Sequence, residues 1–184
     1  RDGGILGEGA TCLLLETVEH AERRNASIYA EILGCGSSQI AMDEKDIKSG
    51  MQYSMNNALV SSNCSPEQID YIGCNGVSDP VLDLAETNAI KEVFKADAYR
   101  TPCSSIKGQI GIPQSAGGTM QLIATLMSIK QGVLLPTRNY EHPDPECDLD
   151  YIADALRYNQ ITKALIHSHG TNNSNTSLVI GATS

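Results

Sequence analysis

Residues 139–151 read Asn-Tyr-Glu-His-Pro-Asp-Pro-Glu-Cys-Asp-Leu-Asp-Tyr, and no other stretch of the chain is as distinctive. Proline fixes one backbone angle, and aspartate side chains bond nearby backbone N–H groups, so both residues favour defined turns. Residues 136–150 are therefore predicted to form an ordered loop and not a flexible linker. On both sides of this loop, segments with the patterns of strands and helices alternate.

Hydrophobic periodicity defines these segments. Short continuous apolar runs predict strands, and apolar residues three or four positions apart predict helices. Residues 43–62, for example, carry Ile47, Met51 and Met55 along one face, which should pack on a sheet. Strands are predicted at 10–16, 27–33, 69–74, 100–103, 164–168 and 177–181, and helical segments at 17–24, 43–62, 79–94 and 115–132.

Capping residues support several of these boundaries. Ser65 with Gln68 three residues later has the signature of a capped short helix. Asp79 before a proline should cap the helix that follows it, and Ser115 should cap the helix that ends near residue 132. The alternation as a whole predicts a layered α/β domain with a largely parallel core. A chain of 184 residues suffices for one well-buried domain.

Charge and hydropathy exclude several classes of partner. The chain has 13 basic and 22 acidic residues and a net charge of −9, with no basic stripe to meet phosphates. A nucleic-acid partner is therefore not expected. No apolar run approaches the length of a membrane span and no signal-peptide pattern is present, so we expect a cytoplasmic protein without a membrane partner.

The cysteines show no arrangement typical of a metal site. They form no Cys-x-x-Cys pair and no zinc-site spacing, and we expect free thiols in a reducing compartment. No metal and no cofactor is predicted. The six are Cys12, Cys35, Cys64, Cys74, Cys103 and Cys147.

Three loops carry the side chains that could perform chemistry. Residues 74–80 follow a strand and precede a helix, which is where α/β sheets bind ligands, but they also fit a plain turn. Residues 107–118 are rich in glycine yet lack the order of a phosphate loop. Residues 167–175 contain His167 and His169 on one strand face, which suits either a metal or structural hydrogen bonds. No catalytic triad or carboxylate pair can be assembled from the residues alone.

Four motifs link these loops to a known family. Residues 1–11 are similar to Arg-Asp-Gly-Phe-x-x-Gly-Glu-Gly-Ala-Gly, and residues 75–79, with Asp83 and Glu86, to His-Gly-Thr-Gly-Thr-x-x-Gly-Asp-x-x-Glu. Residues 104–109 stand where the family has Lys-Ser-x-x-Gly-His, and residues 169–175 where it has Phe-Gly-Phe-Gly-Gly-Thr-Asn. Together with residues 139–151 and 174–179, these motifs resemble the β-ketoacyl-(acyl carrier protein) synthases.

The resemblance implies a thiolase-like layered αβαβα fold, of which residues 1–184 form the C-terminal half. Residues 1–16 are then expected to belong to the sheet of the N-terminal half, which a missing segment or a separate chain would supply. A chain that opens at Arg1, inside a family motif, is expected to be a truncated or processed product or one half of a split subunit. The family's nucleophilic cysteine lies in that other half.

The resemblance also implies a loss of chemistry. Asn75 and Gln109 fill the places of the family's two active-site histidines, and the turn containing His169, Gly170 and Asn172 lacks the gating phenylalanine. We expect these five residues to line a relic site or tunnel without an intact catalytic residue. An amide can donate a hydrogen bond, but it cannot become cationic or exchange a proton near neutral pH.

This pattern is similar to that of the chain-length factor, the β subunit of type II polyketide ketosynthases. The chain is therefore expected to be a non-catalytic subunit that pairs with an active ketosynthase in polyketide or fatty-acid assembly and meets acyl carrier protein through that complex. The alternative is a divergent or non-elongating acyltransferase whose nucleophilic cysteine lies in the missing half or in a partner chain.

Overall fold

The computed structural model describes the chain except for residues 1, 41–46, 154 and 184. A five-stranded sheet with the strand order β1-β7-β6-β2-β3 forms its centre, and β4 and β5 make a small second sheet. The strands are β1 Glu31–Gln39, β2 Tyr71–Gly73, β3 Cys103–Ser104, β4 Val133–Leu134, β5 Arg157–Tyr158, β6 Lys163–His169 and β7 Ser174–Gly181. The helices are α1 Val18–Arg23, α2 Ile47–Ser61, α3 Pro80–Phe94, α4 Lys107–Ile110 and α5 Gly117–Gln131, with 3-10 turns at Pro66–Gln68, Lys95–Tyr99 and Gln114–Ala116.

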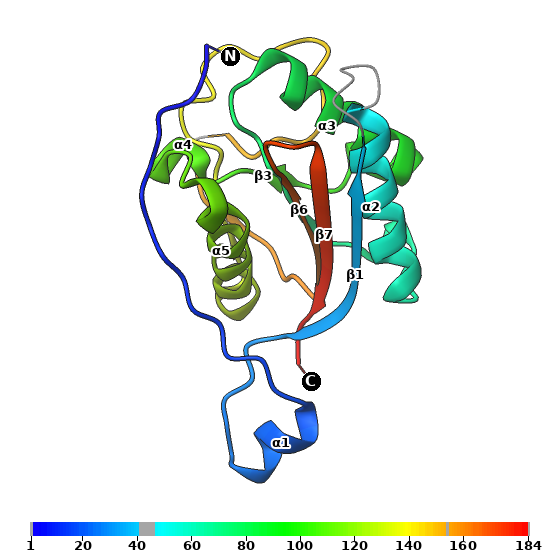
Figure 1. The fold of residues 1–184 in the computed structure, drawn as a ribbon, viewed down its shortest axis with the longest axis vertical. Coiled ribbons are helices and arrows are strands. Elements are labelled where there is room, and N and C mark those ends of the chain that lie inside the picture. Colours follow the sequence, from blue (N-terminus) through cyan, green and yellow to red (C-terminus); the bar gives the residue numbers. More distant parts are fainter. Residues whose placement is uncertain (1, 41–46, 154, 184) are drawn as a thin grey trace.

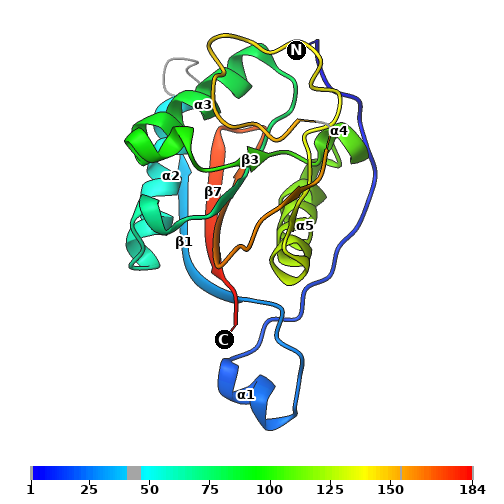
Figure 2. The same cartoon turned by 180° about the vertical axis from the view of Figure 1, so that it is seen from behind.

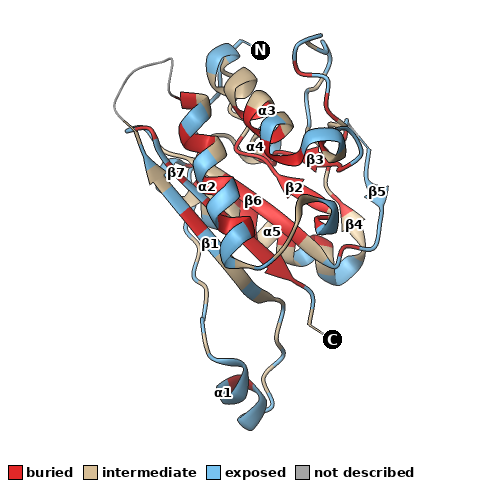
Figure 3. Cartoon of the chain, turned by 90° about the vertical axis from the view of Figure 1, so that its right-hand side faces the viewer, coloured by how far each residue is buried: buried red, intermediate tan, exposed pale blue. Residues whose placement is uncertain are grey.

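Helices cover both faces of the central sheet. α2 and α3 lie against one face, and α5 lies against the other (Figures 1 and 2). The two faces bury separate apolar clusters, and β2 and β6 at the middle of the sheet are buried (Figure 3). The predicted apolar stripe of residues 43–62 is confirmed, since Ile47, Met51 and Met55 all lie on the buried face of α2. The part of that prediction at residues 43–46 lies outside the described residues.

The sheet is mixed, so the prediction of a largely parallel core is wrong. β2 pairs in parallel with β3 and β6, but β7 pairs antiparallel with both β6 and β1. Only residues 170–173 connect β6 to β7. So short a connection can join antiparallel neighbours but cannot make the crossover that parallel strands need.

Two of the three predicted caps are confirmed. The Asp79 carboxylate accepts the backbone N–H groups of Val81 at 2.8 Å and Leu82 at 2.9 Å, and Gln68 Oε1 accepts the backbone N–H of Ser65 at 3.0 Å. The prediction for Ser115 is wrong. That residue lies inside a 3-10 turn that runs directly into α5, so the helix begins without a side-chain cap.

The loop at residues 136–150 is ordered, as predicted. Thr137 N–H donates to the Ile152 carbonyl at 2.7 Å, and Glu146 N–H donates to Asp144 Oδ1 at 2.9 Å. Lys91 of α3 forms an ion pair with Asp148, while Cys147 is buried. The Lys91–Asp148 pair fixes the loop against α3, and Cys103 N–H, which donates to the Asp150 carbonyl at 3.0 Å, fixes its end against β3.

The predicted strand at residues 10–16 is not formed. This segment is extended but has no strand partner among the described residues, and Leu14 and Leu15 are 77% and 71% exposed. It belongs to an arm, residues 2–30, that runs past α5 to the protruding helix α1 and returns from there to β1 (Figures 1 and 2). A strand needs a neighbour to pair its backbone groups, and the central sheet does not provide one here.

Within the described part of the chain, all six cysteines are free thiols. No cluster of three or more His, Cys, Asp or Glu side chains there is arranged to hold a metal ion. Among the helices described, none combines the length and the apolar character needed to cross a membrane.

Asp79 provides a test of the caps. Asp79→Ala should lower the free energy of unfolding by about 0.5–2 kcal/mol, because two N–H groups at the start of α3 lose their acceptor. Asp79→Asn, which can still accept these hydrogen bonds, should recover most of the loss. Urea unfolding followed by circular dichroism measures both; equal destabilisation by the two variants would contradict the capping role.

Candidate functional site

Three strand ends bring the candidate loops together. β2, β3 and β6 run in parallel, and Gly73 is paired with both Ser104 and Ile166. The loops that follow these strands therefore leave the same edge of the sheet, where α/β folds place their sites. Asn75 follows β2, Lys107 follows β3, and His169 ends β6.

The carboxamide of Asn75 is the meeting point of these loops. Asn75 is buried, and its Oδ1 accepts a hydrogen bond from Lys107 Nζ at 2.8 Å and another from the His169 backbone N–H at 3.2 Å. The Lys107 ammonium also donates to the backbone carbonyl of Asn75. Burial lowers the pKa of Lys107, although the nearby carboxylates of Glu86 and Asp83 oppose this shift. Two of the predicted site residues, Asn75 and His169, are thus in direct contact.

Glu86 of α3 holds the loop after β2. Its carboxylate accepts the backbone N–H of Asn75 at 2.7 Å and that of Gly76 at 2.9 Å, and it bonds Nδ1 of the buried His167 at 2.7 Å. Burial raises the pKa of Glu86, but the hydrogen bonds from His167 and from the two backbone N–H groups outweigh it, so the net pKa lies below the usual range. Glu86 is therefore a carboxylate, and Nδ1 of His167 is the donor.

His167 and His169 are both held by hydrogen bonds. His169 Nδ1 lies 2.9 Å from Asn175 Oδ1, and His167 Nδ1 is bonded to Glu86. Nε2 of His167 is buried and has no hydrogen-bond partner among the described residues. The pair thus has the structural hydrogen bonds that were one of the two interpretations of its sequence.

The other predicted site residues lie apart from the Asn75 carboxamide. Gln109 Nε2 donates to the Pro136 carbonyl at 2.8 Å, which turns this side chain toward the loop before residue 139. Gly170 N–H closes the β6–β7 turn on the Ser174 carbonyl at 2.8 Å, and Asn172 is exposed in that turn. Gln109 and Asn172 are therefore not bonded to the centre formed by Asn75, Lys107 and His169.

A cavity of about 780 Å³ lies beside this centre. Its lining combines the charged groups of Lys107, Asp83 and Glu86 with the apolar side chains of Ile110 and Ile112. The ordered loop and the first residues of the arm complete its wall. The arm is attached there by backbone bonds, from Gly3 N–H to Ser78 O at 3.0 Å and from Gly7 N–H to Ile112 O at 3.0 Å. These lining segments are residues 2–6, 76–78, 107–112 and 137–142.

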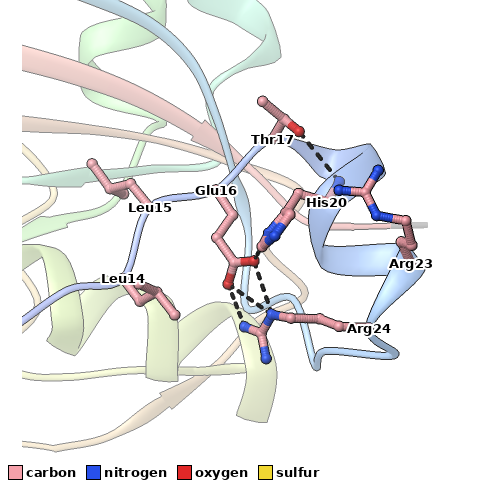
Figure 4. Close-up of a pocket in the computed structure, with 7 residues that line it drawn as sticks. All are labelled: Leu14, Leu15, Glu16, Thr17, His20, Arg23 and Arg24. Atoms are coloured by element: carbon pink, nitrogen blue, oxygen red, sulfur yellow. Dashed lines mark hydrogen bonds and ion pairs between the residues drawn. The ribbon is translucent and has the colours of Figure 1, made fainter.

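A second hollow lies on the arm, at the end of the molecule opposite α3 and α4 (Figure 1). Figure 4 shows the Glu16 carboxylate bound by hydrogen bonds and ion pairs to Arg24 and His20, with Leu14 and Leu15 nearby in the same segment. Hydrogen bonds from Arg24 and His20 lower the pKa of Glu16 to about 2. The charged or polar groups of His20 and Arg24 are thus both bonded to Glu16.

Comparison with protein families identifies the fold. The model of the β-ketoacyl synthase C-terminal domain matches residues 29–141. The chain belongs to this family. The predicted thiolase-like α/β fold of a ketosynthase C-terminal half is thereby confirmed.

Among curated proteins, this β-ketoacyl synthase domain is 39% identical to 3-oxoacyl-[acyl-carrier-protein] synthase 2 of Coxiella burnetii, over 98% of this chain and 44% of that protein. It is 37% identical to the tetracenomycin polyketide synthase ketoacyl synthase alpha subunit of Streptomyces glaucescens, over 90% of this chain and 39% of that protein. The chain thus spans less than half the length of these relatives.

Two solved structures show the same relation. The type II polyketide ketosynthase AntDE in complex with its acyl carrier protein AntF matches with a TM-score of 0.88 and 33% identity, over 92% of this chain and 42% of that chain. The ishigamide ketosynthase/chain length factor matches with a TM-score of 0.91 and 28% identity, over 99% of this chain and 45% of that chain.

Sequence reasoning on this β-ketoacyl synthase domain missed Lys107 as a site residue. The signal was present, because Lys107 and Gly111 have the spacing of the lysine and glycine in Lys-Ser-x-x-Gly-His. In that register Ile112, not Gln109, takes the place of the histidine. The contact between Lys107 and Asn75 draws attention to this second register.

Proposed function

We propose that this chain is a catalytically degenerate ketosynthase-like subunit, similar to a chain-length factor, that pairs with an active ketosynthase in polyketide or fatty-acid chain assembly. The main observation in support of this proposal concerns the residue that stands at the position of the first family histidine. The residue there is Asn75, whose carboxamide oxygen is occupied by the Lys107 ammonium and the His169 N–H. This group can neither take up a proton nor turn its oxygen acceptor into a donor for an enolate.

The second family histidine is absent from this chain whether its motif is aligned with residues 104–109 or with residues 107–112. Gln109 fills the place in one register and Ile112 in the other, and both line the cavity. An amide keeps a hydrogen-bond donor, whereas isoleucine supplies none. Losing one preorganised donor typically costs about two to three orders of magnitude in rate. Neither an amide nor isoleucine can exchange a proton or become cationic, so the loss of both histidines should leave no useful condensation.

The orientation of α5 supports a partner half. The side of α5 that faces the sheet is mixed: Gln121, Thr125 and Ser128 are buried there, and so is Leu122. Gln121 bonds Tyr71 and the backbone of Ile106. The predicted apolar stripe of the helix, Met120, Ile123, Ala124 and Met127, points away from the sheet and is only partly covered. A helix that exposes its apolar stripe is expected to pack on further protein. The exposed Leu14 and Leu15 of the arm suggest the same.

The partner we propose is a ketosynthase half or chain that carries the nucleophilic cysteine. Acyl carrier protein would be met through that complex and would dock mainly on the catalytic partner. The net charge of −9 supports this division, since it offers little attraction to an acidic carrier. The similar solved structure, in which a ketosynthase is bound to its acyl carrier protein, supports the proposal of such a complex.

A second candidate function is a divergent or non-elongating acyltransferase whose cysteine lies in the remaining half. The observation that favours it is the intact cluster of Lys107, Glu86 and Asp83 around the site. Similarity to proteins named as synthases points the same way. Stable acylation of a subunit built from this chain, detected by mass spectrometry, would select this alternative.

The chain should form no carbon–carbon bond when it is given acyl-loaded and malonyl-loaded carrier protein. Asn75→His combined with Gln109→His, or with Ile112→His, should not restore condensation, because the cysteine and the gating phenylalanine are still absent. Product analysis by liquid chromatography and mass spectrometry measures this, with an active ketosynthase as the positive control. Cysteine-dependent condensation by the chain would overturn the proposal.

A further inference from the structure

The amine of Lys107 lies against a carboxamide that can act as an acyl donor. Lys107 Nζ is 2.8 Å from Asn75 Oδ1, and a second bond to the Asn75 carbonyl holds the lysine over the same residue. A carbonyl bond is about 1.2 Å long, so Nζ lies within about 4 Å of Cγ. Reacting atoms in near-attack arrangements are about 3–3.5 Å apart. A small movement of the lysine therefore brings its nitrogen onto the amide carbon.

The surroundings favour reaction between these two groups. Burial lowers the pKa of Lys107 and so increases the share of neutral, nucleophilic amine. Asn75 is only 5% exposed, which limits the access of water as a competing nucleophile. The His169 N–H donates to Oδ1 at 3.2 Å and remains as a donor when the lysine stops donating to that oxygen. It can stabilise negative charge that develops there during attack.

We propose that Lys107 and Asn75 form an intramolecular isopeptide bond. The neutral lysine nitrogen attacks Cγ of Asn75, the bond from Cγ to Nδ2 breaks, and one proton of the lysine nitrogen leaves with the departing group as ammonia. No oxidant, reductant or other co-reactant is needed. The product is a side-chain amide that ties the loop after β2 to the first residue of α4 and permanently closes the position of the first family histidine. The cross-link is independent of the proposed function, because neither the presence nor the absence of condensation bears on it.

One competing reaction starts from the same carbon. In an Asn-Gly sequence the backbone nitrogen of the glycine can attack the asparagine Cγ, which gives a succinimide and also releases ammonia. Here Gly76 N–H is held by Glu86 Oε2 at 2.9 Å. That bond fixes the glycine nitrogen and favours attack by the lysine.

The intact mass of the purified chain under denaturing conditions tests the cross-link. Most of the chain should be lighter than its sequence by one ammonia molecule. After digestion, the peptide with Asn75 should be joined to the peptide with Lys107, and trypsin should no longer cleave after Lys107. An unchanged mass, a mass raised by deamidation, or a succinimide at residues 75–76 that hydroxylamine cleaves would each overturn the proposal.

Lysine-to-arginine variants supply a matched pair. Lys107→Arg keeps the positive charge but should abolish the ammonia loss. Lys91→Arg, which alters another lysine held by an ion pair and a backbone carbonyl, should retain it. Ammonia loss that persists in Lys107→Arg would overturn the cross-link. If either variant fails to fold, the peptide map of the unaltered chain decides alone.

Discussion

Replacing Glu86 by alanine should lower the free energy of unfolding by about 3–5 kcal/mol, the largest stability effect that we expect for a single residue of the site. The substitution removes the acceptor of the Asn75 and Gly76 N–H groups and the partner of the buried His167. Unpaired buried donors cost about 1–3 kcal/mol each, and these three share one acceptor. Urea unfolding at neutral pH measures the change.

Glu92→Ala is the control for this experiment. Glu92 belongs to the same helix, but its side chain is exposed and forms an ion pair with Lys95. Exposed ion pairs contribute about 0–1 kcal/mol, so this variant should differ little from the unaltered chain. A Glu86→Ala variant as stable as Glu92→Ala would contradict the role of Glu86 in ordering the loop.

The contribution of Glu86 should depend on pH in a defined direction. Its folded-state pKa is lowered, so its stabilising effect is fully present above the ordinary pKa of glutamate and is lost as the pH falls through the folded-state value. Glu86→Gln should remove this part of the acid dependence. Stability curves measured from neutral to acidic pH should therefore converge at low pH; curves that stay parallel would contradict the lowered pKa.

Acidic substitutions on the outer stripe of α5 should abolish assembly with the partner half. Ile123→Asp combined with Met127→Asp places two charges on a stripe that is only partly covered in this chain. Charges in the core of an interface cost several kcal/mol, so affinity should fall by at least about two orders of magnitude. Co-purification and isothermal titration with a ketosynthase partner measure the effect.

The fold of the double variant should persist, because neither side chain is buried in this chain. Gln131→Asp, an exposed substitution at the end of the same helix, should leave the affinity nearly unchanged. If the double variant binds the partner as tightly as the unaltered chain does, α5 is not the interface.

Local signals predicted the helices well. The apolar stripe of α2 and the cap at Asp79 depend on neighbours within one or two turns, and both are confirmed. Periodicity also located the apolar stripe of α5. It did not show which side of that helix packs on the sheet, because the sheet-facing side combines the apolar Leu122 with the buried, hydrogen-bonded Gln121.

Features that depend on distant contacts were harder to predict. Residues 10–16 have the composition of a strand, yet a strand forms only where a neighbour pairs with it. The centre at Asn75 was predicted from family motifs, but the contacts that Lys107 and Glu86 make with residues 75 and 76 form only where three strand ends meet. Gln109 was assigned from a motif that fits in two registers, and its side chain turns to Pro136.

The most direct test of the catalytic degeneracy uses the assembled complex with the partner's nucleophilic cysteine replaced by alanine. Acyl-loaded and malonyl-loaded carrier protein are supplied, and both products and covalently bound acyl groups are measured by mass spectrometry. If this chain is a non-catalytic subunit, condensation stops and no acyl group is found on it. Continued condensation, or a stable acyl group on a cysteine of this chain, would contradict that assignment.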